Sequence, residues 1–259
     1  MSHFPQASTL KLSTKVGLNG KSIIDKMLFT PPFKVISPLF HKHYSEIMLL
    51  CVSAGLLKGD RQDINLHIGA KSQILLSTQS YEKIHDTQNG AAKREMYITL
   101  EENALLEYAP LPCIPFANAC FSSCTNIHLH EHSKLYYSEI LCAGRVERGE
   151  IFAFREFHSK LFISLKGRLI FFENTHLNPQ TMPLRSLCAF REYTHSLSYV
   201  IFDKNLDKKA LEAKVLSSPI NVGISFCDDV VVIKALAKQA QALIELRDSL
   251  SALKTSPKL

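Results

Sequence analysis

The stretch INLHIGAKSQILLST (residues 64–78) contains the two kinds of strand that recur along this chain. In its first part (64–68), apolar and polar residues alternate, and a period of two gives a strand one apolar face and one polar face. Its second part (73–78) is apolar on both faces, as in a strand that lies between two layers. The two patterns together favour sheets that stack face to face.

The same two patterns recur on both sides of this stretch. Alternation marks residues 10–16 and 127–130. Strands of about six residues, rich in β-branched or aromatic side chains, are expected where both faces are apolar. Such segments are IMLLCV (47–52), LFISL (161–165), RLIFF (168–172) and LSYVIF (197–202). We therefore expect a mainly β protein, built from stacked β-sheets of many short strands as a single domain over residues 1–259.

One or two helices are expected, both near the C-terminus. Residues 207–218 predict a short helix that Pro219 stops, and residues 229–237 predict a strand. Residues 238–254 predict an amphipathic helix, whose apolar face we expect to pack on the protein's own sheet, with a partner-binding helix as the alternative. That face carries leucines at spacings of three and four: Leu243, Leu246, Leu250 and Leu253.

The composition indicates an ordered, cytoplasmic protein. Hydrophobic residues make up 46% of the 259 residues, which argues against disorder. The N-terminal residues have no long apolar run and no stretch of about 18 apolar residues occurs, so we expect neither a signal peptide nor a membrane segment. The seven cysteines are then expected to be free thiols. The net charge of +6 is not concentrated in a basic stripe, which argues against nucleic-acid binding.

Motifs that would indicate catalysis are missing from the sequence. It contains no GxSxG, P-loop, GxGxxG or HExxH pattern. Cys113 lies in a proline-rich loop (108–119) and is the one suggestive thiol. We therefore expect a protein that is not an enzyme, and a cysteine-dependent hydrolase remains as an alternative.

A histidine-rich segment, HLHEH, suggests a second alternative. On a strand, His128, His130 and His132 would share one face, and imidazole suits borderline cations such as nickel. Neighbouring residues on that face are about 7 Å apart, which is too far for a tight common site without a bend. A solvated strand face is the simpler interpretation, and a nickel storage protein remains open.

Three carboxylates fall on apolar strand faces: Glu107, Glu139 and Glu156. A carboxylate in such a place must be paired, hydrogen-bonded, protonated or in contact with water inside a cavity. For Glu139 the simplest expectation is a structural pair with Arg145. The sharper hypothesis is an internal polar path for a divalent cation, since carboxylates and water are oxygen ligands that could hold such a cation loosely.

Five segments together resemble the UreD/UreH family of urease accessory proteins, and the UreH branch in particular. The order of the segments and their prolines carry the resemblance, which runs from about residue 8 to the final helix. The segments are FTPPFKV (29–35), SAGLLKGD (53–60), STQSYEKIH (77–85), LEYAPLPCIPFANACF (106–121) and YSEILCAGRVERGEIFAF (137–154).

The resemblance implies a cytoplasmic scaffold protein without catalysis of its own. It implies partners: a UreF-like accessory protein, a UreG-like GTPase that carries nickel, and the urease apoprotein. No tightly bound cofactor is implied, only transient Ni²⁺, for which an internal water-filled tunnel is proposed in such proteins. Within the matching segments, polar residues expected near a path or an interface are Asp60, Thr78, Ser80, Glu139 and Arg145.

Overall fold

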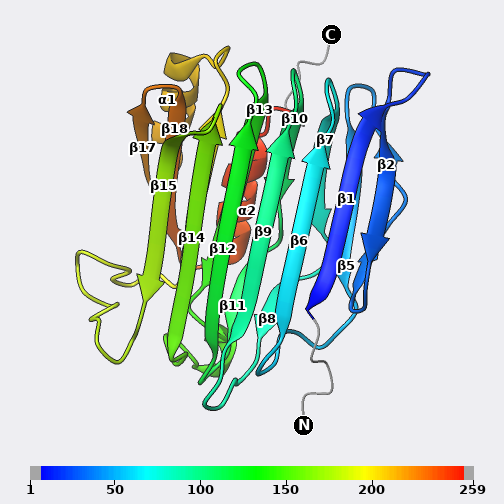
Figure 1. Cartoon of the computed structure of the whole chain (residues 1–259). Coiled ribbons are helices and arrows are strands. Elements are labelled where there is room, and N and C mark those ends of the chain that lie inside the picture. Colours follow the sequence, from blue (N-terminus) through cyan, green and yellow to red (C-terminus); the bar gives the residue numbers. More distant parts are fainter. Residues whose placement is uncertain (1–6, 254–259) are drawn as a thin grey trace.

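The computed structural model describes residues 7–253, which form two β-sheets that face each other (Figure 1). The smaller sheet contains β1 (Ser8–Val16), β2 (Ser22–Phe29), β6 (Arg61–Ile68), β9 (Ala92–Leu100), β12 (Cys120–Leu129), β14 (Glu156–Leu165) and β15 (Arg168–Leu177). The larger sheet contains β3 (Phe33–Val35), β4 (Leu39–Phe40), β5 (Ser45–Cys51), β7 (Gln73–Thr78), β8 (Glu82–Ile84), β10 (Leu105–Ala109), β11 (Cys113–Pro115), β13 (Lys134–Cys142), β16 (His195–Phe202), β17 (Asn221–Cys227) and β18 (Val230–Ala237). The prediction of a mainly β protein with stacked sheets is confirmed.

The chain winds between the two sheets as a coil. In the smaller sheet, β6, β9, β12 and β14 pair in parallel, and in the larger sheet β5, β7, β10 and β13 do so. Parallel neighbours need a crossover connection, and here a strand of the other sheet provides it. The spatial order is β15-β14-β12-β9-β6-β1-β2 in one sheet and β17-β18-β16-β13-β10-β7-β5-β3 in the other. The sequence predicted stacked sheets but not this solenoid-like winding.

Short turns of equal length join the coils at one end of the sheets. They span residues 69–72, 101–104 and 130–133, between β6 and β7, β9 and β10, and β12 and β13. Each turn is closed in the same way, as when the Ser72 N–H donates to the Gly69 carbonyl at 3.0 Å. The turns have different sequences, GAKS, EENA and HEHS, so this repeat in structure is not visible as a repeat in sequence.

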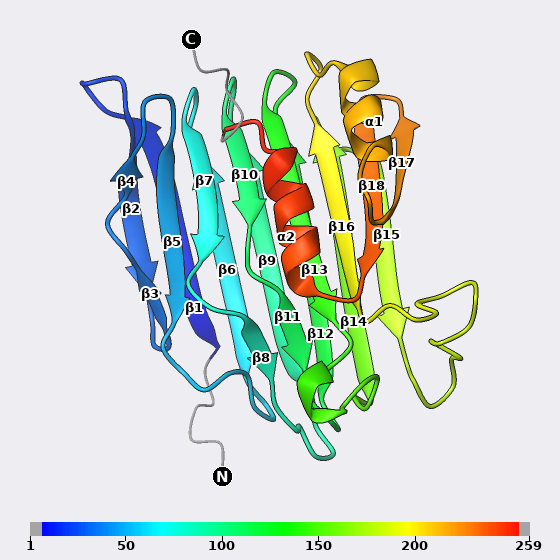
Figure 2. The same ribbon diagram turned by 180° about the vertical axis from the view of Figure 1, so that it is seen from behind.

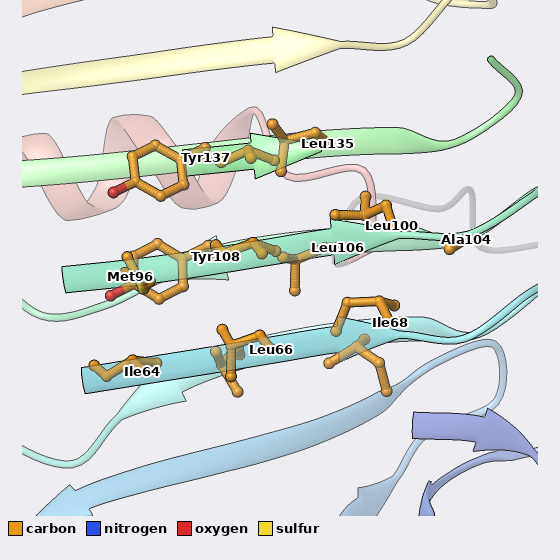
Figure 3. Close-up of a cluster of buried hydrophobic side chains, with 14 of the residues drawn as sticks. Ile64, Leu66, Ile68, Met96, Leu100, Ala104, Leu106, Tyr108, Leu135 and Tyr137 are labelled. Carbon is orange, nitrogen blue, oxygen red and sulfur yellow. The ribbon is translucent and has the colours of Figure 1, made fainter. Parts of the chain in front are cut away.

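The main apolar core lies between the two sheets, where the alternating segments turn their apolar face inward. Ile64, Leu66 and Ile68 are buried there, as predicted. Figure 3 shows these side chains on β6 next to those of β9, β10 and β13. Tyr108 and Tyr137 stack at 5.0 Å between ring centroids. Their hydroxyl groups point away from the labelled leucines (Figure 3), and that of Tyr137 donates to Glu139 Oε1 at 2.6 Å.

A second core lies on the outer face of the larger sheet, under α1 (Lys208–Leu216) and α2 (Ala240–Ser249) (Figure 2). The leucine face of the predicted C-terminal helix packs on this sheet, which confirms the first interpretation of that helix. The helix is shorter than the predicted 238–254, and Leu253 follows it in a turn that packs against Leu75 and Ala109. No helix within residues 7–253 is long and apolar enough to cross a membrane.

The prediction that RLIFF (168–172) is buried on both faces is wrong. This segment lies in β15, the edge strand of the smaller sheet. Leu169 and Phe172 are exposed there, because no layer of the described chain covers the outer face of this sheet (Figure 1). LSYVIF (197–202) is buried on both faces as predicted, because the helices cover the outer face of β16.

The packing of α2 can be tested with Leu243, which is fully buried against the larger sheet. We expect Leu243→Ala to lower the free energy of unfolding by about 2–5 kcal/mol, because it removes buried apolar contacts and leaves a cavity. Gln241→Ala, on the exposed side of the same helix, should change it by less than about 0.5 kcal/mol. Urea unfolding followed by circular dichroism measures both. Equal effects would contradict the described orientation of the helix.

Candidate functional site

A row of polar side chains crosses the inner face of the smaller sheet. The strand register places Gln62 beside Arg94, Arg94 beside Ser123, Ser123 beside Ser159 and Ser159 beside Thr175. These residues come from five neighbouring strands, β6, β9, β12, β14 and β15. They lie at one height on a face that is otherwise apolar.

A second polar row faces the first from the larger sheet. Glu139 on β13 pairs with Ser198 on β16, and Ser198 pairs with Lys234 on β18. The two rows meet where the Ser159 hydroxyl donates to Glu139 Oε2 at 3.1 Å. We call the two rows together the polar band, which consists of Gln62, Arg94, Ser123, Ser159, Thr175, Glu139, Ser198 and Lys234.

The polar band separates two apolar clusters between the sheets. The main core lies on one side of it, and on the other side is a smaller cluster that includes Phe121, Leu141 and Phe157. The side chains of Leu184 and Phe190 come from the loop between β15 and β16, and both are buried. The band therefore crosses the interior as a polar layer inside an apolar sandwich.

A cavity of about 690 Å³, partly open to solvent, lies between the sheets along this band. All eight residues of the polar band line it, together with residues of two loops, at 53–55 and 184–190. The space is large and polar enough to hold several water molecules, each of which needs polar partners. The arrangement therefore provides a space between the two sheets that can admit water.

Glu139 is the carboxylate at the centre of this space. It accepts hydrogen bonds from the Tyr137 hydroxyl at 2.6 Å and from the Ser159 hydroxyl at 3.1 Å. Within residues 7–253 it has no ion-pair partner. Burial raises the pKa of this carboxyl above its usual range, and the two hydroxyl donors only partly offset that effect. Glu139 thus faces the cavity with neutral partners.

The other two carboxylates along the cavity are paired with cations. Glu82 forms an ion pair with Arg94, whose Nε and Nη2 also donate to Gln62 Oε1 at 2.9 and 2.7 Å. At the opposite end, Glu173 pairs with Lys234 and accepts from the Ser198 hydroxyl at 2.9 Å. The central carboxylate, which has only neutral partners among residues 7–253, therefore lies between two ion pairs.

Three of the five residues singled out in the sequence line this cavity: Thr78, Ser80 and Glu139. Thr78 Oγ1 accepts a hydrogen bond from the Leu111 N–H at 2.8 Å, which ties the end of β7 to the proline-rich segment. Ser80 follows β7 in a bend and is exposed. Their role along a path stays a prediction.

The other two residues, Asp60 and Arg145, lie away from the cavity lining. Asp60 Oδ2 accepts from the Leu57 N–H at 2.8 Å, so it caps the turn between Gly55 and Gly59, both of which have positive φ. Arg145 forms an ion pair with Glu150 and lies 4.2 Å above the Phe116 ring. The expected pair of Glu139 with Arg145 is therefore wrong, because a carboxylate five residues away in the same loop takes the guanidinium.

The two other carboxylates on predicted apolar faces have different environments. Glu107 is buried on the outer side of the larger sheet, where it accepts from the Ser251 hydroxyl at 2.6 Å. Glu156 is partly exposed and lies 2.9 Å from His176 Nε2. Glu156 is the first residue of β14, and the residues before it form a loop, so it stands at a strand end rather than within an apolar strand face.

The histidines of HLHEH do not share a strand face. Of the three, His128 alone lies in β12, which ends at Leu129, and its Nδ1 lies 2.7 Å from the Ser164 hydroxyl. His130 and His132 belong to the turn that follows. In the described part of the chain, no group of three His, Cys, Asp or Glu residues is arranged to hold a metal ion. The expected common face is therefore wrong.

Sequence reasoning missed the residues that complete the band, above all Arg94, Ser159, Glu173 and Lys234. Each is a polar residue at an inward position of a strand that also carries apolar residues. Within each strand, the alternation of side chains already shows that such a polar residue falls on the apolar face. It becomes a row only when the register of neighbouring strands is known.

Comparison with known proteins agrees with the resemblance seen in the sequence. A model of the family described as UreD urease accessory protein matches residues 6–258. The chain belongs to this family. The urease accessory protein UreH of Helicobacter hepaticus is 53% identical over 251 residues, which cover 97% of this chain and 100% of that relative. UreH of Helicobacter pylori (strain G27) is 41% identical over 98% of this chain and 97% of its own length. A UreD of Acetivibrio thermocellus is 39% identical over 81% of this chain and 80% of its own length.

The cysteines of this UreD-family protein can be ranked by reactivity. Cys113 lines the cavity, and burial raises its pKa well above the usual range, with a further contribution from Glu82. Burial also raises the pKa of Cys142 to about 12. The nucleophile and ligand form of cysteine is the thiolate, so these environments oppose the chemistry that a cysteine-dependent hydrolase would need.

We expect iodoacetamide to alkylate Cys188 and Cys227, the exposed thiols of the native protein, much faster than Cys113 and Cys142. Mass spectrometry of peptides taken at successive times measures the order. Alkylation under denaturing conditions is the control, because all four cysteines should then react at similar rates. If Cys113 reacted first in the native protein, the hydrolase alternative would return.

The environment of Glu139 also predicts a pH effect on stability. Its folded-state pKa is raised above the ordinary 4.5, so between these two values the folded protein binds more protons than the unfolded chain. Glu139 therefore lowers the free energy of unfolding as the pH rises through that window, and the lowered value persists above it. We expect Glu139→Gln to gain stability relative to the unmodified protein as the pH rises, in paired urea unfolding series. A difference between the two proteins that does not change with pH would contradict the raised pKa.

Proposed function

We propose that this UreD-family protein is a urease maturation factor without catalysis of its own, which passes nickel toward the urease apoprotein through its internal cavity. The observation that carries the proposal is the polar band, with Glu139 at its centre between two ion pairs. A protein that needed only a stable fold would gain nothing from a polar layer of this size between two apolar clusters.

The ligands along the band suit transient contact with a divalent cation. They are hydroxyl and carboxylate oxygens, which bind nickel more weakly than clustered imidazoles or thiolates would. A hydrated cation needs ligands that it can both bind and leave. Glu139 accepts hydrogen bonds from two hydroxyl groups and has no ion-pair partner within residues 7–253, so it can bind such a cation without breaking an ion pair.

The proposed partners are a UreF-like accessory protein, a UreG-like GTPase and the urease apoprotein. The sequence resemblance suggests them, and the surface offers room for them. Large apolar side chains are exposed at the end of the molecule formed by β2 and β4 (Figure 2), where a monomeric protein rarely leaves so many uncovered. They are Met27, Leu28, Phe29, Leu39 and Phe40.

The proposal is tested by Glu139→Gln, which keeps the shape of the side chain and removes its charge. We expect the fold and co-purification with the UreF-like partner to survive, while the nickel content of urease matured in the same cells falls by about tenfold, since a lost charged ligand costs more than about 1.4 kcal/mol. Metal analysis of purified urease gives the readout.

Glu107→Gln is the matched control, because Glu107 is also buried but faces the C-terminal segment on the other side of the larger sheet. It should destabilise the fold by about 1–3 kcal/mol by weakening buried hydrogen bonds, without lowering the nickel delivered per intact complex. Normal nickel content with Glu139→Gln in an intact complex would refute the passage. Equal losses with both variants would point to a general structural effect instead.

A further inference from the structure

Arg94 places a fixed positive charge in the wall of the cavity that we propose nickel enters. Its guanidinium is held from three sides: by the Glu82 carboxylate on β8, by Gln62 Oε1 on β6, and by the ring of Phe121 on β12, 5.6 Å from its Cζ. A guanidinium remains protonated at any physiological pH. The charge is therefore permanent, and its position is set by residues of three different strands.

This charge is sheltered from solvent, unlike the other cation of the polar band. The side chain of Arg94 is 15% exposed, whereas that of Lys234 is 51% exposed. Water and salt screen an exposed charge much more than a buried one. The field inside the cavity is therefore dominated by Arg94 on the cationic side.

The field of Arg94 reaches Glu139. Burial and the nearby Glu173 carboxylate raise the pKa of the Glu139 carboxyl, and the Arg94 charge acts in the opposite direction. In the smaller sheet, Arg94 lies two strands from Ser159, which is a separation of about 10 Å, and Ser159 donates to Glu139. A charge at this distance that favours the ionised carboxylate must also repel a cation bound to it.

We propose that Arg94 sets how weakly the interior of this protein holds a divalent cation, so that the cavity acts as a passage rather than as a store. The inference rests on the proposed passage of nickel past Glu139. In this arrangement Glu139 attracts the cation, and the nearby guanidinium prevents the cation from remaining there. Glu82 and Gln62 hold the guanidinium beside the path.

The decisive variant is the double substitution Arg94→Gln with Glu82→Gln. It removes both members of the ion pair, so the net charge is unchanged and no unpaired charge stays buried. Nickel chloride binding to the full-length protein is measured by equilibrium dialysis at several pH values, so that competition by protons is seen separately. We expect the double variant to bind nickel at least about tenfold more tightly than the unmodified protein. In the complex with its partners, it should deliver less nickel to urease.

Two controls separate charge from shape and position. Arg94→Lys keeps the charge and loses the planar fork, and it should bind nickel as the unmodified protein does. Lys234→Gln with Glu173→Gln removes the solvent-facing ion pair of the same cavity, and it should not tighten binding. If Arg94→Lys tightened binding as much as the double variant, side-chain geometry rather than charge would be responsible, and the inference would fall.

Other outcomes are equally informative. Unchanged nickel affinity in a folded Arg94→Gln, Glu82→Gln protein overturns the inference. If that protein does not fold, Arg94→Met with Glu82→Leu replaces the pair by apolar side chains, a change that is often tolerated, and the same expectation applies. Adding Glu139→Gln to either double variant should abolish the gain in affinity. Normal nickel delivery by the Glu139→Gln variant alone would refute the passage itself. If Glu139→Gln clearly lowers delivery but the double variants bind nickel with unchanged affinity, only the role of Arg94 is refuted.

Discussion

In-register pairing of parallel strands is the constraint on which the interior of this protein depends. Once β6, β9, β12 and β14 pair without a shift, every residue on one strand has a fixed neighbour on the next. A slip of one residue would turn each side chain to the other face. Buried leucines and isoleucines on either side of the polar band prevent such a slip, so the apolar core is what aligns the polar residues into a row.

The strands were predictable from sequence because their signal is local. Alternation at 64–68 and a double apolar face at 197–202 each follow from the residues themselves, and the structure confirms both. The winding of the chain was not predictable, because the turns GAKS, EENA and HEHS share a shape but no sequence. RLIFF was misjudged for a related reason: whether an outer face is covered depends on which layer lies over it, and no local pattern records that.

The site was predictable to a lesser extent. An inward carboxylate at Glu139 was visible from alternation alone, and the structure places it on the cavity. Its partner Ser159 was not visible, since that hydroxyl reaches Glu139 across the gap between the sheets. Arg145 was the nearest arginine in sequence, but its loop brings Glu150 to it at once, and a local ion pair that needs no ordering of distant segments is favoured over a distant one.

Glu107 and Glu139 are two buried carboxylates of the larger sheet that lie on opposite faces and in different environments. Glu107 faces the outer side of the larger sheet, where Ser251 and the backbone of the C-terminal segment donate to it. Those contacts join the segment after α2 to the sheet.

Glu139 faces inward, where its donors are themselves hydroxyls that can accept hydrogen bonds from water. Ser123 donates to Ser159, which donates to Glu139, so the hydrogen bonds continue along the band rather than ending at the carboxylate. A chain of hydroxyls of this kind satisfies the buried charge and remains able to exchange its partners. In the passage that we propose, that property distinguishes a path from a structural contact, and it follows from placing serines, rather than leucines, at one height on two neighbouring strands.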